Sequence, residues 1–149
     1  MRIFLDNCCY GRPYDIQSSE RIKSEAEAMV YIQRLITSKK IELATSYILH
    51  YENLKKTDII KRDTIDSFIR KNRSIYIGIE NIEKLTEITK EIMSTGIKTN
   101  DAYHVASAIL ANCKYFISVD DRLLKYNSDE IILVNSIEFV KIFGDDKNE

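Results

Sequence analysis

The stretch 99–125, TNDAYHVASAILANCKYFISVDDRLLK, constrains the fold of this chain more than any other. Its first half has apolar residues at helical spacing, which predicts a helix with Asp101 in its first turn. The segment 115–119 is aromatic and β-branched, which is typical of a buried strand. Asp120 follows this strand directly. One acid is therefore expected at the start of a helix and another at the end of a strand.

Strands and helices alternate along the rest of the chain. Further strands are expected at 2–5, 41–45, 74–77 and 131–134, and longer helices at 20–38, from 47, at 81–95 and from 136. A loop with the only proline is expected over 7–19, and short helices over 54–73. This alternation predicts a parallel sheet with helices on both faces. We expect an α/β chain with a single domain over 1–149, built as three α/β/α layers around a central parallel sheet of four to five strands.

Composition excludes two classes of protein. The chain has 149 residues and a net charge of −1, so it is not a polycation that binds nucleic acid without specificity. It has no apolar stretch near the roughly 20 residues that a membrane span needs. The apolar run near the start, 3–5, is too short for a signal peptide. We therefore expect a cytoplasmic protein that does not enter a membrane.

The cysteines do not suggest a disulfide or a zinc site. There are three, of which Cys8 and Cys9 are adjacent and Cys113 is distant. Neither a C-x-x-C nor an H-x-x-x-H spacing occurs, so the ligand pattern of zinc is missing. We expect the cysteines to be small buried apolar residues.

Carboxylates are expected at one edge of the sheet. Asp6 and Asp120 each follow an apolar strand, and the carboxyl ends of parallel strands share an edge. Asp101 begins a helix that runs back along the sheet, so its start lies at the same edge. Glu52 lies about two turns into the helix after the strand 41–45, near this edge but not certainly on it.

Several carboxylates in one pocket cannot all be ionised unless a cation compensates them or some are protonated. Because the expected ligands are oxygens, Mg²⁺ or Mn²⁺ is the favoured ion. Such ions suit in-line attack on a phosphodiester. The alternative is that each acid is a helix cap or turn residue.

Other catalytic patterns are missing from the sequence. It has no G-x-G-x-x-G, no P-loop and no G-x-S-x-G. The two histidines, His50 and His104, fall in predicted helices without an evident partner. We expect both to be partly exposed helix residues.

Four segments resemble the PIN-domain family, metal-dependent ribonucleases that include toxins of bacterial toxin–antitoxin pairs. The segments are IFLDNCCY at 3–10, ATSYILHYE at 44–52, KTNDAYHVASAI at 98–109 and YFISVDD at 115–121. The last two are the most specific, and the resemblance covers essentially the whole chain. It implies a four- or five-stranded parallel sheet and one or two bound Mg²⁺ or Mn²⁺ ions.

The resemblance also implies roles for individual residues. The residues implied to be catalytic and to bind the metal are Asp6, Glu52, Asp101 and Asp120. Those implied to support them are Asn7, Ser118 and Asp121. The chain departs from the family after Asp6, where Asn7-Cys8-Cys9-Tyr10 leads into GRPYD. There, Arg12 and Asp15 are either a substrate contact or an ion pair that stabilises the loop.

The stretch 54–73 carries seven Lys or Arg against three Asp, a local balance of +4. Together with Arg12, its Lys55, Lys56 and Arg62 are the candidates for contacts to RNA phosphates. The alternative is a solvated helix surface.

The favoured function is an endoribonuclease, the toxin of a type II pair, with an antitoxin partner and, as is common in the family, a homodimer. One alternative is a non-catalytic PIN-like domain that binds RNA or protein, for which an acid should be lost. Another is a phosphoacceptor domain, which should have a lysine after a late strand where this chain has Asn135.

Overall fold

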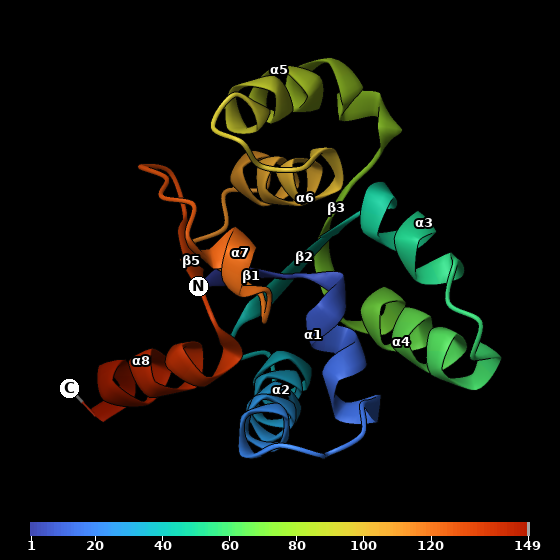
Figure 1. Cartoon of the computed structure of the whole chain (residues 1–149), viewed down its shortest axis with the longest axis vertical. Helices are drawn as coiled ribbons and strands as arrows, with labels where there is room; N and C mark the ends of the chain where they lie inside the picture. Colours follow the sequence, from blue (N-terminus) through green and yellow to red (C-terminus); the bar gives the residue numbers. More distant parts are fainter. Residues whose placement is uncertain (149) are drawn as a thin grey trace.

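The computed structural model describes residues 1–148 of the chain and contains one five-stranded parallel sheet (Figure 1). The strands are β1 (Arg2–Leu5), β2 (Glu42–Ser46), β3 (Arg73–Ile77), β4 (Tyr115–Ile117) and β5 (Ile132–Val134). The α-helices are α1 (Asn7–Gly11), α2 (Glu20–Thr37), α3 (Tyr47–Leu54), α4 (Ile59–Asn72), α5 (Ile82–Met93), α6 (Thr99–Leu110), α7 (Asp121–Leu124) and α8 (Ser136–Asn148). Two 3₁₀ helices complete the order, η1 (Arg12–Tyr14) and η2 (Ile79–Asn81). The three-layer α/β/α prediction is confirmed.

The strand order is β3-β2-β1-β4-β5, and every pairing is parallel. Helices α5 and α6 cover one face of the sheet and α2 and α8 the other, while α3 and α4 lie beside the β3 edge (Figure 1). The central strand β1 is apolar almost throughout because helices cover both of its faces. Its Phe4 is fully buried and stacks on Phe116 of β4, with 5.6 Å between ring centroids.

Short polar side chains begin two of the long helices. The Ser19 hydroxyl accepts a hydrogen bond from the Ile22 amide and caps α2. The Ser46 hydroxyl accepts one from the Leu49 amide, so α3 begins where β2 ends. A cap of this kind at the carboxyl edge lets the chain turn directly from a parallel strand into a helix.

The prediction of a loop over 7–19 was wrong for residues 7–14, which form α1 and η1. Asp6 caps α1 by accepting a hydrogen bond from the Asn7 amide, and Pro13 stands in the first turn of η1, where a missing N–H costs nothing. Strands β4 and β5 are shorter than predicted, by two residues and by one residue. The presence of α1 matters for the site because this helix lies directly beside the acids.

The three cysteines are free thiols, and Cys9 and Cys113 are buried as expected. Cys8 is only partly buried. Within residues 1–148, no helix combines the length and apolar character needed to cross a membrane.

Candidate active site

The four acids that the sequence singles out come from four elements that meet at the carboxyl edge of the sheet. Asp6 directly follows β1, Asp120 lies beyond β4 and caps α7, and Asp101 stands in the first turn of α6. Glu52 lies in α3, the helix that leaves β2. Because β2, β1 and β4 are neighbours in the sheet, their carboxyl ends bring these acids to one place. We call the four residues the acidic cluster.

Ser118 connects two members of the acidic cluster. Its buried hydroxyl donates a 2.8 Å hydrogen bond to Asp6 Oδ2 and accepts one of 3.1 Å from the Asp120 amide. The Cys8 thiol also lies 3.4 Å from Asp6 Oδ2. These contacts hold the Asp6 carboxylate in one orientation and place the start of α7 beside it.

Asn7 connects the other side of the cluster. Its side-chain amide donates a 3.0 Å hydrogen bond to Glu52 Oε1, while its backbone N–H donates to Asp6. One residue therefore holds two carboxylates that are 46 positions apart in the sequence. Asn7 is one of the residues that the family resemblance implies to support the acids, and these are its contacts to them.

His104 was predicted to be partly exposed and without a partner, and this prediction was wrong. The ring is 1% exposed, and Nε2 donates a 2.5 Å hydrogen bond to Glu52 Oε2. Among the residues that the structure describes, none is a hydrogen-bond partner for its Nδ1. The signal in the sequence was the spacing, because His104 is three residues from Asp101 and shares its face of the helix.

Burial and nearby charges act in opposite directions on the pKa of His104. Burial lowers the pKa of its imidazole, but the hydrogen bond to Glu52 and the negative charge of Asp6 outweigh burial, so the pKa is raised. The same contact lowers the pKa of Glu52 against the opposing effect of its own burial. The contact therefore favours the charged form of both groups.

Asp101 carries the uncompensated charge of the cluster. Its pKa is raised, first by burial and then by the negative charges of Asp6 and Asp120, while His104 opposes this effect. A carboxylate that its neighbours destabilise in this way is stabilised by a cation placed among them.

A cavity of about 270 Å³ lies against Asp101 and Asp120, with Lys98 and Arg122 also in its lining. Carboxylate oxygens are the donors that Mg²⁺ and Mn²⁺ prefer, so the residues fit such an ion by their chemistry. Over the described part of the chain, no three His, Cys, Asp or Glu side chains stand close enough together to hold a metal ion. Mg²⁺ commonly keeps several waters and takes only one or two protein carboxylates, a requirement that this pair meets in number.

Two residues that sequence reasoning linked to the site are held in ion pairs instead. Both guanidinium ends of Arg21 donate to Asp121, at 2.8 and 2.5 Å, and this contact lowers the pKa of Asp121. Arg12 lies 3.0 Å from Asp15 and 3.2 Å from the fully buried Glu25. Of the two interpretations of Arg12, the structure has the ion pair that stabilises the loop.

The basic residues of 54–73 differ in their surroundings. Lys56 is half-buried and donates a 3.0 Å hydrogen bond to Asn7 Oδ1 at the border of the acidic cluster. Lys55 is exposed to solvent, and Arg62 pairs with Asp63 at 3.1 Å. The structure therefore brings only Lys56 of these three to the cluster.

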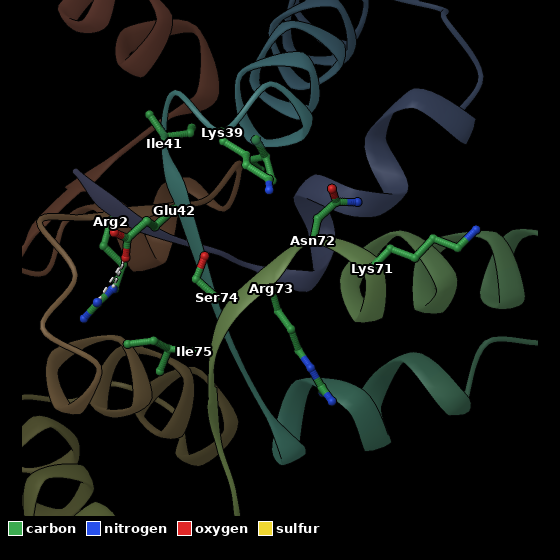
Figure 2. Close-up of a pocket in the computed structure, with 10 residues that line it drawn as sticks. Arg2, Lys39, Ile41, Glu42, Lys71, Asn72, Arg73, Ser74 and Ile75 are labelled. Carbon is green, nitrogen blue, oxygen red and sulfur yellow. Dashed lines mark hydrogen bonds and ion pairs between the residues drawn. The ribbon is translucent and has the colours of Figure 1, made fainter.

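A second hollow, of about 730 Å³, opens at the opposite, amino edge of the sheet (Figure 2). Its charged lining residues are Arg2, Lys39, Lys71, Arg73 and Glu42. Arg2 is paired with Glu42 at 3.0 Å, and in Figure 2 the side chains of Lys71 and Arg73 point away from Lys39. Because these cations do not converge on one point, the carboxyl edge is the better candidate for a functional site.

Comparisons with known proteins agree on the fold only. No protein-family model matches the sequence, and no curated protein matches it. Among solved structures, a chain of VapBC2 from Rickettsia felis, bound to a DNA fragment from their promoter, superposes with a TM-score of 0.61. The match covers 91% of this chain and 98% of that chain at 16% sequence identity.

Proposed function

We propose that the protein is a metal-dependent endoribonuclease that hydrolyses RNA phosphodiester bonds. The observation that carries this proposal is the gathering of Asp6, Glu52, Asp101 and Asp120 at the carboxyl edge, where burial and then the charges of Asp6 and Asp120 raise the pKa of Asp101. Carboxylates in such an arrangement are suited to a hard cation and to phosphoryl chemistry.

Each residue has a distinct part in the proposal. Asp101 and Asp120, which line the cavity, are the first candidates to hold Mg²⁺ or Mn²⁺. Asp6 and Glu52 would act from beside them, through water molecules bound to the ion or through the charge that they add to the cluster. Ser118 orients Asp6, and Asn7 and His104 orient Glu52. The ion would supply an activated water and stabilise the charge that develops on the phosphate.

The proposed biological role is that of a toxin in a type II toxin–antitoxin pair. Its support is the fold shared with a chain of the VapBC2 complex, together with the sequence resemblance to the PIN-domain family. We propose an antitoxin partner on the same grounds, and a homodimer and a cytoplasmic location from the family resemblance. None of these depends on the geometry of the acidic cluster.

One observation favours a second candidate, a domain that binds RNA or protein without cutting it. Each Glu52 oxygen already accepts one hydrogen bond, one from Asn7 and one from His104, so fewer of its lone pairs are open to a ligand. A catalytic role for Glu52 would use the lone pairs that these two hydrogen bonds leave open.

The deciding experiment is cleavage of a mixed RNA pool by the purified protein in Mn²⁺ and in EDTA. Asp101→Asn is the test variant, because it removes a carboxylate charge at constant volume. Asp129→Asn is the matched control, because Asp129 is exposed before β5, at the opposite edge of the sheet. We expect cleavage in Mn²⁺ by the wild type and the control, and none in EDTA or by Asp101→Asn.

Two results would go against the proposal. Full activity of a folded Asp101→Asn variant would move the active site away from the acidic cluster. Failure of the wild type to cut any RNA in the pool, with Mn²⁺ present, would favour the binding domain.

A further inference from the structure

Two lysines, Lys56 and Lys61, lie beside the acidic cluster on its α1 side. Lys56 follows α3, and its ammonium donates to Asn7 Oδ1 at 3.0 Å. The amide of the same Asn7 side chain donates to Glu52 Oε1. One asparagine side chain therefore separates the Lys56 ammonium from a carboxylate of the cluster.

Lys61 reaches the same part of the molecule from the first turn of α4. Its ammonium lies over the ring of Tyr14, 5.6 Å from the centroid. It also lies against Gly11, where a Cβ atom would stand 3.5 Å from Nζ. The Lys61 ammonium therefore lies beside α1, the helix that also carries Asn7.

The two ammonium groups act on each other. Burial and then the charge of Lys61 lower the pKa of Lys56 to about 8, against the opposing charge of Glu52. Across the described residues, 1–148, neither lysine takes part in an ion pair. Two neighbouring cations that are not in ion pairs form a place where an anion is stabilised by both.

Two other basic residues on the α1 side of the cluster are held in ion pairs. Arg12 is held by Asp15 and the buried Glu25, and Arg62 is paired with Asp63. The cationic surface next to the acids on this side is therefore reduced to the lysine pair.

We propose that Lys56 and Lys61 bind one backbone phosphate of the RNA strand, next to the phosphodiester that the acidic cluster cuts. The inference rests on the proposed function and deepens it, since it assigns the residues that hold the substrate. RNA is favoured as the ligand because its phosphates are spaced along one strand. One phosphate can then sit on the lysines while its neighbour lies at the acids. Compact ammonium charges are suited to phosphate oxygens.

The test is the salt dependence of RNA binding, which does not require catalysis. A fluorescently labelled single-stranded RNA is titrated with protein in EDTA at a series of KCl concentrations. The slope of log K against log[KCl] falls by about 0.7 for each phosphate of a single strand that the protein no longer neutralises. Because Lys56 and Lys61 bind the same phosphate, we expect the Lys56→Met/Lys61→Met variant to reduce the slope by about 0.7.

Two controls separate position from charge. The Lys84→Met/Lys90→Met variant removes two exposed lysines from α5 and gives the same net charge, so its slope should equal that of the wild type. The Lys56→Arg/Lys61→Arg variant keeps both charges and should retain most of the slope. Thermal unfolding of every variant shows whether weaker binding comes from an unfolded protein.

An unchanged slope in the folded Met variant overturns the inference, whether or not the wild type cuts RNA. A reduced slope without cleavage in Mn²⁺ leaves the lysine pair as an RNA site and overturns the nuclease instead. Equal binding of a poly-glutamate peptide, with equal weakening in the Met variant, overturns the assignment to RNA and gives the pair to an acidic protein segment.

Discussion

Removal of the His104 ring should weaken both the fold and the orientation of Glu52. The ring is 1% exposed and the Glu52 side chain 34% exposed, so the contact lies between the buried and the surface case. Hydrogen bonds to charged groups contribute about 1.5–3 kcal/mol, and exposed ion pairs at most about 1 kcal/mol. Glu52 keeps its Asn7 donor after the change. We therefore expect a coupling energy of about 1.5–2 kcal/mol.

The coupling can be isolated with a double-mutant cycle of His104→Ala, Glu52→Ala and the double variant. His104→Ala alone should lower the free energy of unfolding by about 3–5 kcal/mol, because it also leaves a cavity beside Phe4. In the cycle, the free energy lost to that cavity cancels, because it is present with and without Glu52. Urea unfolding in EDTA supplies the free energies, and the slope of each transition shows whether it remains two-state.

A second measurement distinguishes orientation from stability. If His104 positions Glu52 for an ion, His104→Ala should weaken Mn²⁺ binding by about 10- to 100-fold, as is usual when a partner of a metal ligand is removed. His50→Ala is the matched control, because His50 pairs with Asp66 on α4 and not with the cluster. A coupling energy below about 0.5 kcal/mol, or unchanged Mn²⁺ affinity in a folded variant, would refute this reasoning.

Three further predictions concern charge. Asp101→Asn removes a carboxylate whose raised pKa shows that its negative charge destabilises the fold. This destabilisation is present at neutral pH and disappears when the carboxylate is protonated in acid. The variant should therefore be more stable than the wild type by about 0.5–2 kcal/mol in EDTA at pH 7. A lower melting temperature in differential scanning fluorimetry would contradict it. Glu25→Ala leaves Arg12 and Arg21 without their buried partner. It should lower the free energy of unfolding, measured in urea, by about 3–5 kcal/mol. A decrease of less than about 1 kcal/mol would show that these ion pairs do not stabilise the fold. Wild-type affinity for RNA should fall above about pH 8 as Lys56 loses its proton, whereas Lys56→Arg should hold its affinity to higher pH; parallel titration curves would show that Lys56 is not the group involved.

Local patterns were enough for the architecture and for the position of most acids. Alternating strands and helices require parallel pairing, and parallel pairing sends Asp6 and Asp120 to one edge whatever the order of the strands. The helix starts expected at 20 and 47 agree with those of α2 and α3. These features are readable because each depends on residues within a few positions of one another.

Contacts between distant segments were not readable in the same way. The sequence predicts a partly exposed His104. In the structure α6 lies beside α3, and this arrangement brings Glu52 within hydrogen-bond distance of the ring. Arg12 and Asp121 were equally good candidates for the site by position along the chain. In the structure Arg12 pairs with the buried Glu25, 13 positions away in the sequence. Asp121 pairs with Arg21, 100 positions away.

There is a physical reason why the sequence predicts the fold class but not the contacts between distant segments. Helical spacing, capping and the direction of parallel strands are local rules, so the sequence states the fold class and the edge at which acids collect. Burial and charge pairing depend on which helix faces lie against each other, and that arrangement arises only when the whole chain packs. It is this packing that selects His104 over His50, and Lys56 over Lys55, as neighbours of the acidic cluster.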